Sequence, residues 1–155
     1  MTPRSADGRQ RSNGRERGQG LVEFSLALIP FLFLVMAVVD LGRGIYTSNG
    51  VAQAAREIAR AASVHQCAGP CTSATWSAEI LEVVNAQKAL VPGLRTSDIT
   101  IECVGIDDTV WVVSAKCLDG KFIRVRTSAT FQLVTPLLPV PNPFTVSSTA
   151  HVQVP

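Results

Sequence analysis

The strongest feature of the hydrophobic pattern is a long apolar run near the start of the chain. From Leu21 to Val39 the sequence reads LVEFSLALIPFLFLVMAVV, in which Glu23 is the ionisable residue. As an α-helix these residues would be about 28 Å long, close to the hydrocarbon thickness of a bilayer. The run therefore predicts a membrane-spanning helix, and Pro30 should kink it in a way that membrane helices tolerate.

The pattern after the span is that of amphipathic helices. Residues 41–64 are predicted to continue as helix, with charged side chains on the solvent side and an apolar stripe on the other. The loop HQCAGPCTSAT follows, and then a second amphipathic helix from about Ser77 to Leu90, which Pro92 and Gly93 should end. The apolar stripe of the first of these helices consists of Val51, Ala54, Ala55, Ile58, Ala59 and Ala62.

The period of the pattern changes in the C-terminal third of the chain. Near alternation and β-branched residues predict antiparallel strands, which turn-like Asp107-Asp108, Asp119-Gly120 and a Pro-rich stretch separate. We therefore expect an α+β fold: a long N-terminal transmembrane helix continuing into an extracytoplasmic helix, packed with a second helix on a small antiparallel sheet. The predicted strands are 98–104, 109–117, 121–134 and 144–154. The predicted regions are a basic cytoplasmic leader 1–18, a transmembrane helix 19–40 and an extracytoplasmic α+β domain 41–155.

A cleavable secretory signal is the alternative explanation of a basic start followed by an apolar run. The run exceeds the roughly 7 to 15 residues usual in such signals, and DLGRGIY after Val39 offers no clear small-x-small cleavage site. A membrane span is therefore favoured. By the positive-inside rule the arginines before the span place the N-terminus in the cytoplasm and everything after Val39 outside, as in a single-pass membrane protein. These arginines are Arg4, Arg9, Arg11, Arg15 and Arg17, and Arg43 follows the span.

Charge and composition narrow the class of protein. The chain is 46% hydrophobic and 17% charged, which is too apolar for a disordered protein. Residues 1–18 are an exception, because they are rich in Arg, Gly and Ser and are expected to be disordered. This tail has five arginines against Asp7 and Glu16, a net charge of +3, so the rest of the chain is near neutral at −1. We therefore expect no nucleic-acid partner.

The four cysteines all lie in the part expected outside the cytoplasm, where thiols oxidise. Three connectivities are possible for two disulfides. We favour Cys67–Cys71 around the AGP turn and Cys103–Cys117 across neighbouring strands. A four-thiolate zinc site is the alternative, but the spacings C-x3-C and C-x13-C are irregular for zinc and the compartment does not suit it.

Candidate catalytic groups are few. His65 lies beside the first cysteine and His151 on the last predicted strand, and neither belongs to a nucleophile or metal constellation. The sequence therefore predicts no enzyme, no cofactor, no metal and no small-molecule substrate.

The edge of the span carries the most informative spacing. Gly18 is followed by a hydrophobic helix with Glu23 at the fifth position, which resembles the processing site of type IV prepilins. The resemblance implies cleavage after Gly18 by a prepilin peptidase and a new α-amino group on Gln19. It also implies that the carboxylate of Glu23 meets the amino terminus of a neighbouring subunit, which would offset the cost of placing both groups in an apolar bundle. An interfacial Glu23 without a partner is the simpler alternative.

A longer string widens the resemblance. VEF before the hydrophobic helix, D-L-G-R after it (Asp40 to Arg43) and A-A-R-E-I-A-R (Ala54 to Arg60) make residues 17–63 similar to the TadE-like family of Flp-type, or tight adherence, pilus proteins. The C-terminal strands and the TPLLP turn (Thr135 to Pro139) match more loosely. The family implies other pilin or pseudopilin subunits and the pilus assembly machinery as partners, and incorporation in an adhesive surface pilus.

Two hypotheses follow from these observations. In the first, the protein is a minor pilin or pseudopilin that is trimmed after Gly18 and assembled. In the second, it is a permanently anchored extracytoplasmic binding or envelope protein that is neither processed nor polymerised. The residues expected to matter are Gly18 and Gln19 for processing, Glu23 and Phe24 for assembly, Leu21, Leu28, Pro30, Phe33 and Val39 for the anchor, and Asp40, Arg43 and Arg56 as interfacial or intersubunit charges.

Overall fold

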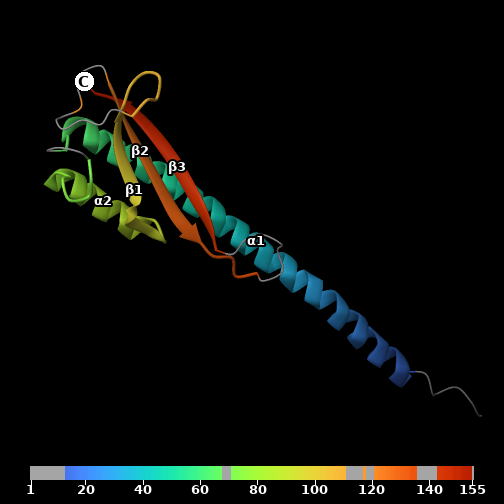
Figure 1. The fold of residues 1–155 in the computed structure, drawn as a ribbon. Coiled ribbons are helices and arrows are strands. Elements are labelled where there is room, and N and C mark those ends of the chain that lie inside the picture. Colours follow the sequence, from blue (N-terminus) through green and yellow to red (C-terminus); the bar gives the residue numbers. More distant parts are fainter. Residues whose placement is uncertain (1–12, 68–70, 111–116, 118–120, 136–142, 155) are drawn as a thin grey trace, which may run out of the picture. The chain divides into compact units, whose positions relative to one another are not determined.

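The first helix is the longest element of the protein. The computed structural model describes residues 13–67, 71–110, 117, 121–135 and 143–154, with side chains from residue 18 onward. Helix α1 (Asn13–Val64) contains Pro30 and includes both the apolar run and the amphipathic segment after it (Figure 1). Residues 13–18 are helical, which differs from their expected disorder, while residues 1–12 lie outside the described residues. Adding a turn to an existing helix costs far less than nucleating a new one, which explains the extension.

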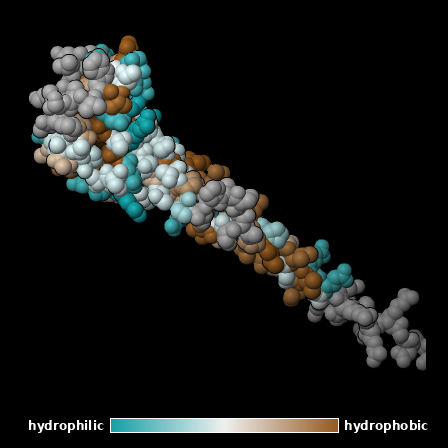
Figure 2. All heavy atoms as spheres, viewed as in Figure 1, coloured by the Kyte–Doolittle hydropathy of each residue, from teal (hydrophilic) through white to brown (hydrophobic). Residues whose placement is uncertain are grey.

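The structure divides into two units, Met1–Val39 and Asp40–Pro155. In the first unit the apolar side chains of α1 have no core to join: Leu21 is 70% exposed, Phe24 65% and Leu34 62%. The apolar residues of this unit form much of the hydrophobic surface of α1 that is visible in Figure 2. By length and composition α1 can cross a membrane, and none of its most apolar stretch is buried.

The second unit is an α+β domain. It contains α1 from Asp40 onward, α2 (Ala78–Leu90) and a three-stranded antiparallel sheet in the order β1-β2-β3. The strands are β1 (Leu94–Val104), β2 (Phe122–Phe131) and β3 (Phe144–Gln153). This confirms the predicted fold class, with both helices contributing to the core against one face of the sheet (Figure 1).

Three of the predicted strands correspond to β1, β2 and β3. Strand β1 begins four residues earlier than predicted, and a register shift between Leu94 and Ile99 accommodates the polar residues there. Most of the remaining predicted strand, residues 109–117, lies outside the described residues. Of its described part, Val110 forms an isolated antiparallel bridge with Val104.

The core lies between the predicted apolar stripe of α1 and the inner face of the sheet. All six stripe residues are at most 1% exposed, which confirms the helical period read from the sequence. Alternate residues of β2 face them because side chains alternate across a strand. Thr127 on this face is 1% exposed, and its hydroxyl donates to the carbonyl oxygen of Val51 at 3.0 Å. The inward residues of β2 are Ile123, Val125, Thr127, Ala129 and Phe131.

Local signals in the sequence fix the ends of α2. Ser77 is the N-cap, and its side chain accepts a hydrogen bond from the backbone N–H of Ile80 at 3.3 Å. After the helix the chain turns at Gly93, which has φ +83°. A Cβ atom at this position would lie 2.5 Å from the carbonyl oxygen of Thr130, so only glycine suits the turn.

Two disulfides close the second unit, Cys67–Cys71 and Cys103–Cys117. They are the two pairings favoured from the sequence. Cys67 and Cys103 are both buried, so the bridges add to the core.

Candidate functional site

The candidate site lies where the second unit begins, at the residue that follows the apolar run. Asp40 is only 2% exposed. Its carboxylate accepts hydrogen bonds from the backbone N–H of Val134 at 3.0 Å, the backbone N–H of Thr135 at 2.8 Å and the Thr135 hydroxyl at 2.7 Å. Asp40 thus holds the segment that follows β2, nearly a hundred residues later in the chain.

Arg43 completes this arrangement one helical turn later. Its Nη1 lies 3.1 Å from the Asp40 carboxylate, and its guanidinium lies 5.4 Å from the centroid of the Phe131 ring. The Phe131 ring in turn lies 5.2 Å from that of Phe144, with the ring planes inclined at 56°. Helix α1, the end of β2 and the start of β3 therefore meet at one place, while the Arg43 side chain stays 49% exposed.

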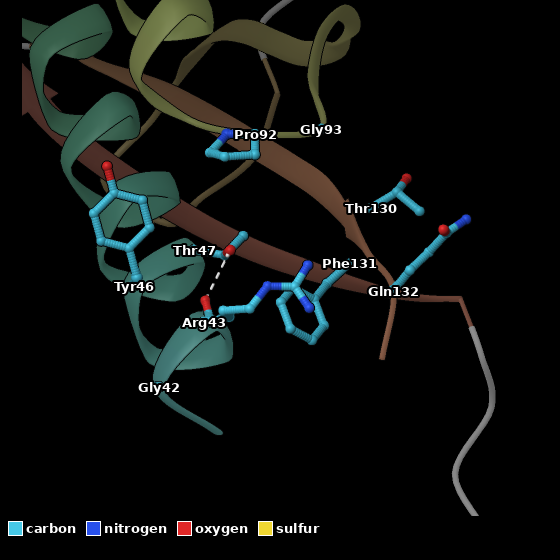
Figure 3. A pocket seen from close by; sticks show the side chains of 9 residues that line it. All are labelled: Gly42, Arg43, Tyr46, Thr47, Pro92, Gly93, Thr130, Phe131 and Gln132. Carbon is cyan, nitrogen blue, oxygen red and sulfur yellow. Dashed lines mark hydrogen bonds between the residues drawn. The ribbon is translucent and has the colours of Figure 1, made fainter. Parts of the chain in front are cut away.

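An open groove of about 530 Å³ lies beside Arg43. Figure 3 shows the Arg43 side chain reaching from α1 toward Phe131, with the Pro92-Gly93 turn on another side. The hydroxyl of Thr47, which also lines the groove, donates to the Arg43 carbonyl oxygen at 3.0 Å. Among the described residues that line this groove, Arg43 is the one with a charge.

A second charged cluster lies on the opposite, outer face of the sheet. The register places Glu102, Arg124 and His151 side by side on β1, β2 and β3. The Arg124 guanidinium donates to Glu102 at 2.6 and 3.0 Å and to Asp108 at 2.9 Å. The hydrogen bond with Glu102 raises the pKa of Arg124 above its ordinary value. The cluster links two strands and the Asp107-Asp108 turn, in which Asp108 has φ 62°.

Carboxylates outside the span have shifted pKa values for local reasons. The pKa of Glu79 is lowered because its own backbone N–H and the Ser77 hydroxyl donate to it at the start of α2. The Thr109 hydroxyl, which donates to Asp107 at 2.8 Å, lowers the pKa of that carboxyl group. In the described part of the chain, no group of three or more His, Cys, Asp or Glu side chains could hold a metal ion.

The residues predicted for processing and assembly lie along the first unit. Gly18, Gln19, Glu23 and Phe24 are all exposed, and no ion pair of Glu23 occurs among the side chains that the structure describes. The predicted anchor residues are exposed as well. These are Leu21, Leu28, Pro30, Phe33 and Val39.

The three predicted interfacial charges are not equivalent. The structure brings Asp40 and Arg43 together, whereas Arg56 is exposed thirteen residues further along α1. Sequence reasoning missed Thr135 as the partner of Asp40. The one signal that could have found it was the loose TPLLP resemblance, which starts at that residue.

Comparison with protein families gives a match in the N-terminal part of the chain, which contains Asp40 and Arg43. The family described as TadE-like protein matches residues 18–60. Residues 18–60 form a TadE-like segment. The match confirms the resemblance drawn from the sequence, and supports an association with Flp-type pili and a single membrane pass. Comparisons with curated proteins and with solved structures gave no match.

The TadE-like segment contains residues of both units. It begins at Gly18, includes the whole apolar run, passes through Asp40 and Arg43, and ends at Arg60 within the helical stripe that packs on the sheet. The sheet itself lies outside it.

Proposed function

We propose that this protein is a minor pilin or pseudopilin of a Flp-type pilus. It is anchored by Leu21–Val39, with its N-terminus in the cytoplasm and the second unit outside, and it takes part in pilus assembly and surface adhesion. The observation that carries the proposal is the TadE-like match over residues 18–60, which includes an apolar helical stretch that the chain leaves wholly unburied.

The exposed apolar surface supports a membrane or helix-bundle environment. Burying a large apolar side chain contributes about 1.5 to 3 kcal/mol, and Phe24, Phe31 and Leu34 are each more than half exposed. A helix with this surface is stable in lipid or against the apolar helices of neighbouring subunits. In the proposed life cycle it uses both environments, first the bilayer and then the pilus.

The two disulfides support the orientation. Both pairs lie after Val39, and disulfides persist in oxidising compartments outside the cytoplasm. The arginines before the span agree with this placement, because positive residues favour the cytoplasmic side.

Cleavage after Gly18 is the chemical step that defines the proposed pathway. Gly18 and Gly20 are both within α1, and glycine destabilises a helix interior by about 1 kcal/mol relative to alanine. This weakness near the end of the helix favours local unwinding, which a peptidase needs to reach the backbone. The exposed Glu23 carboxylate then pairs with the α-amino group of Gln19 of a neighbouring subunit.

The test is the N-terminal sequence and intact mass of the protein from its native host. We expect a mature chain starting at Gln19, and a full-length chain for the Gly18→Ala variant. The matched control is Gly20→Ala, because a Cβ atom meets nothing within 4 Å at either glycine and both changes favour the helix equally. Cleavage should persist in this control.

A second variant separates processing from assembly. Glu23→Gln should be cleaved but should not enter sheared pilus fractions. If the wild-type chain retains its arginine tail, the prepilin pathway is wrong, and the protein is the permanently anchored, unpolymerised one described as the alternative above.

A further inference from the structure

In the second unit, the surface of α1 and α2 that faces away from the sheet carries charges of both signs. Arg60 lies five residues after buried Ala55, about 140° around the helix, and its side chain is 68% exposed. Glu82 is exposed and lies two residues from both Ile80 and Val84, which are buried. Each helix therefore presents a charged side chain on this outer surface, a basic one on α1 and an acidic one on α2.

Contacts between the two helices show that they run antiparallel. The Ser77 hydroxyl, just before α2, donates to the carbonyl oxygen of His65, just after α1, at 3.4 Å. At the other end of α2, a Cβ atom on Gly50 would lie 3.1 Å from a methyl carbon of Val91. The start of α2 is thus beside the end of α1, and the two helices lie next to each other along the whole of α2.

Arg60 and Glu82 lie at nearly the same height along this pair of helices. Arg60 is ten residues after Gly50, and Glu82 is nine residues before Val91. Because the helices are antiparallel and rise about 1.5 Å per residue, the two positions differ in height by about 1.5 Å. A two-fold axis parallel to α1 relates residues at equal height, so it can bring these two charges together without an axial shift.

We propose that this outer helical surface binds a second copy of the chain about a two-fold axis parallel to α1, with Arg60 of each copy paired with Glu82 of the other. In this dimer α1 of one copy lies over α2 of its partner, and the same ion pair forms twice. Closed two-fold contacts of this kind are the commonest form of oligomer. The inference rests on the proposed anchoring at one point: both copies enter the dimer from the same end, as two chains anchored in one membrane must.

The two halves of the surface are complementary in size. Val64 of α1, which is 69% exposed, lies level with Ala78 of α2. Gln53 of α1 lies level with the stretch between Ala86 and Ala89, and all three are exposed. Longer side chains of one copy therefore meet alanines of the other, which allows the helices to approach closely.

A hollow of about 260 Å³ between the two helices adds polar groups that can pair with themselves. Gln53 and Gln87 line it, together with Tyr46 and Leu90, which are 62% and 60% exposed. An amide both donates and accepts hydrogen bonds, so each glutamine can pair with a glutamine of the second copy. Tyr46 and Leu90 provide apolar surface for the contact to bury.

The charges disfavour the competing dimer, in which α1 of one copy lies on α1 of the other. That arrangement would place Arg56 and Arg60 against the same arginines, and like charges in contact oppose binding. With α1 over α2 they lie opposite Glu79 and Glu82, which are exposed. Arg60 contacts Glu57 of its own helix at 3.1 Å through Nη1, and its other N–H groups can donate to the second copy.

Sedimentation equilibrium of the full chain in detergent tests the proposal, and the wild type should form a dimer. Arg60→Glu and Glu82→Arg should each lower the association constant at least about tenfold, because repulsion replaces attraction at both symmetric contacts. An equimolar mixture of the two variants should dimerise again, since the mixed dimer contains one original and one exchanged ion pair. The chain that carries both reversals should also dimerise. The matched control is Arg126→Glu, an exposed arginine on the opposite, outer face of the sheet, which should dimerise like the wild type.

The other outcomes contradict the contact. A monomeric wild type would mean that another partner covers the surface, and assemblies that grow beyond the dimer would indicate a head-to-tail contact. Unchanged dimers of the single reversals, failure of both the mixture and the doubly reversed chain to dimerise, or an equal loss in Arg126→Glu would likewise overturn it. Carbonate extraction of native membranes and the N-terminal sequence score anchoring and processing separately, so their failure is distinguishable from failure of the dimer.

Discussion

The side chain of Asp40 and both donors of Thr135 form a buried contact between residues 95 positions apart in the chain. The Thr135 hydroxyl lies 2.7 Å and its backbone N–H 2.8 Å from the same carboxylate oxygen. An ionised carboxylate accepts hydrogen bonds through both of its oxygens and has no donor. A side chain of similar size with fewer acceptors cannot satisfy all the donors that meet at Asp40. Asp40 therefore determines where the segment after β2 lies.

Substitutions at this contact should lower stability in a defined order. Thr135→Val removes one hydrogen bond and should cost about 1 kcal/mol of unfolding free energy. Asp40→Asn should cost more, because both carboxylate oxygens accept hydrogen bonds, one from Val134 and Thr135 and the other from Arg43. Asparagine has a single acceptor oxygen, so its NH2 group would face donors on one side. Glu57→Gln, which breaks an exposed ion pair with Arg60, is the control and should stay within about 0.5 kcal/mol. Chemical unfolding of the full chain in detergent measures all three, and an Asp40→Asn loss no larger than the control's would contradict the contact.

The turn after α2 makes a prediction about glycine. Gly93→Ala should destabilise the protein by more than about 1 kcal/mol, because the new Cβ atom would meet the Thr130 carbonyl oxygen at a positive φ. Gly42→Ala should be neutral or stabilising by up to about 1 kcal/mol, since that glycine is helical with open space around it. The melting temperature of Gly93→Ala should therefore fall below that of the wild type, whereas the melting temperature of Gly42→Ala should stay the same or rise. Equal shifts would show that the turn does not require glycine.

The outer face of the sheet offers a matched pair of arginines. Arg124→Gln should cost about 1 to 2 kcal/mol, because Glu102 and Asp108 lose their shared partner but remain partly in water. Arg126→Gln, two residues along the same face of β2 and exposed, should change stability by less than about 0.5 kcal/mol. The comparison is made by urea unfolding. A loss at Arg126 as large as that at Arg124 would argue against the cluster.

The start of α2 predicts a pH dependence. The folded-state pKa of Glu79 is lowered from 4.5, so its ionised form stabilises the fold at pH values above 4.5. This contribution is lost as the pH falls through the folded-state pKa. Glu79→Gln should therefore be less stable than the wild type at pH 7, and the difference should decrease as the pH falls through the folded-state pKa, which lies below 4.5. Urea unfolding over a pH series that starts at pH 7 checks this, and a difference that does not decrease on acidification would refute the role of the charge.

The sequence was informative where structure depends on local period and short-range signals. The stripe from Val51 to Ala62 and the helix from about Ser77 to Leu90 follow from helical spacing and from the Pro92-Gly93 stop signal, and the structure places them as predicted. The two disulfide pairings could be favoured because nearby cysteines restrict the geometry. Each of these features involves residues close together in the chain.

What could not be predicted depends on contacts that are distant in sequence. The role of Asp40 requires the end of β2 to return to the start of the second unit, and the alignment of Glu102, Arg124 and His151 requires the strand register. Alternation of apolar residues gives the face of a strand but not its partner residue. The necessity of Gly93 likewise arises from the approach of Thr130 on another element.

The Asp40 contact also has a mechanical consequence. Tension applied along the apolar helix enters the folded unit at residue 40. There it is divided between the continuing backbone of α1 and the hydrogen bonds to Val134 and Thr135, which follow the central strand of the sheet. Part of the load therefore reaches the end of the central strand at residue 40, beside the part that the helix carries. In the proposed pilus, this connection would resist extension at the base of the domain.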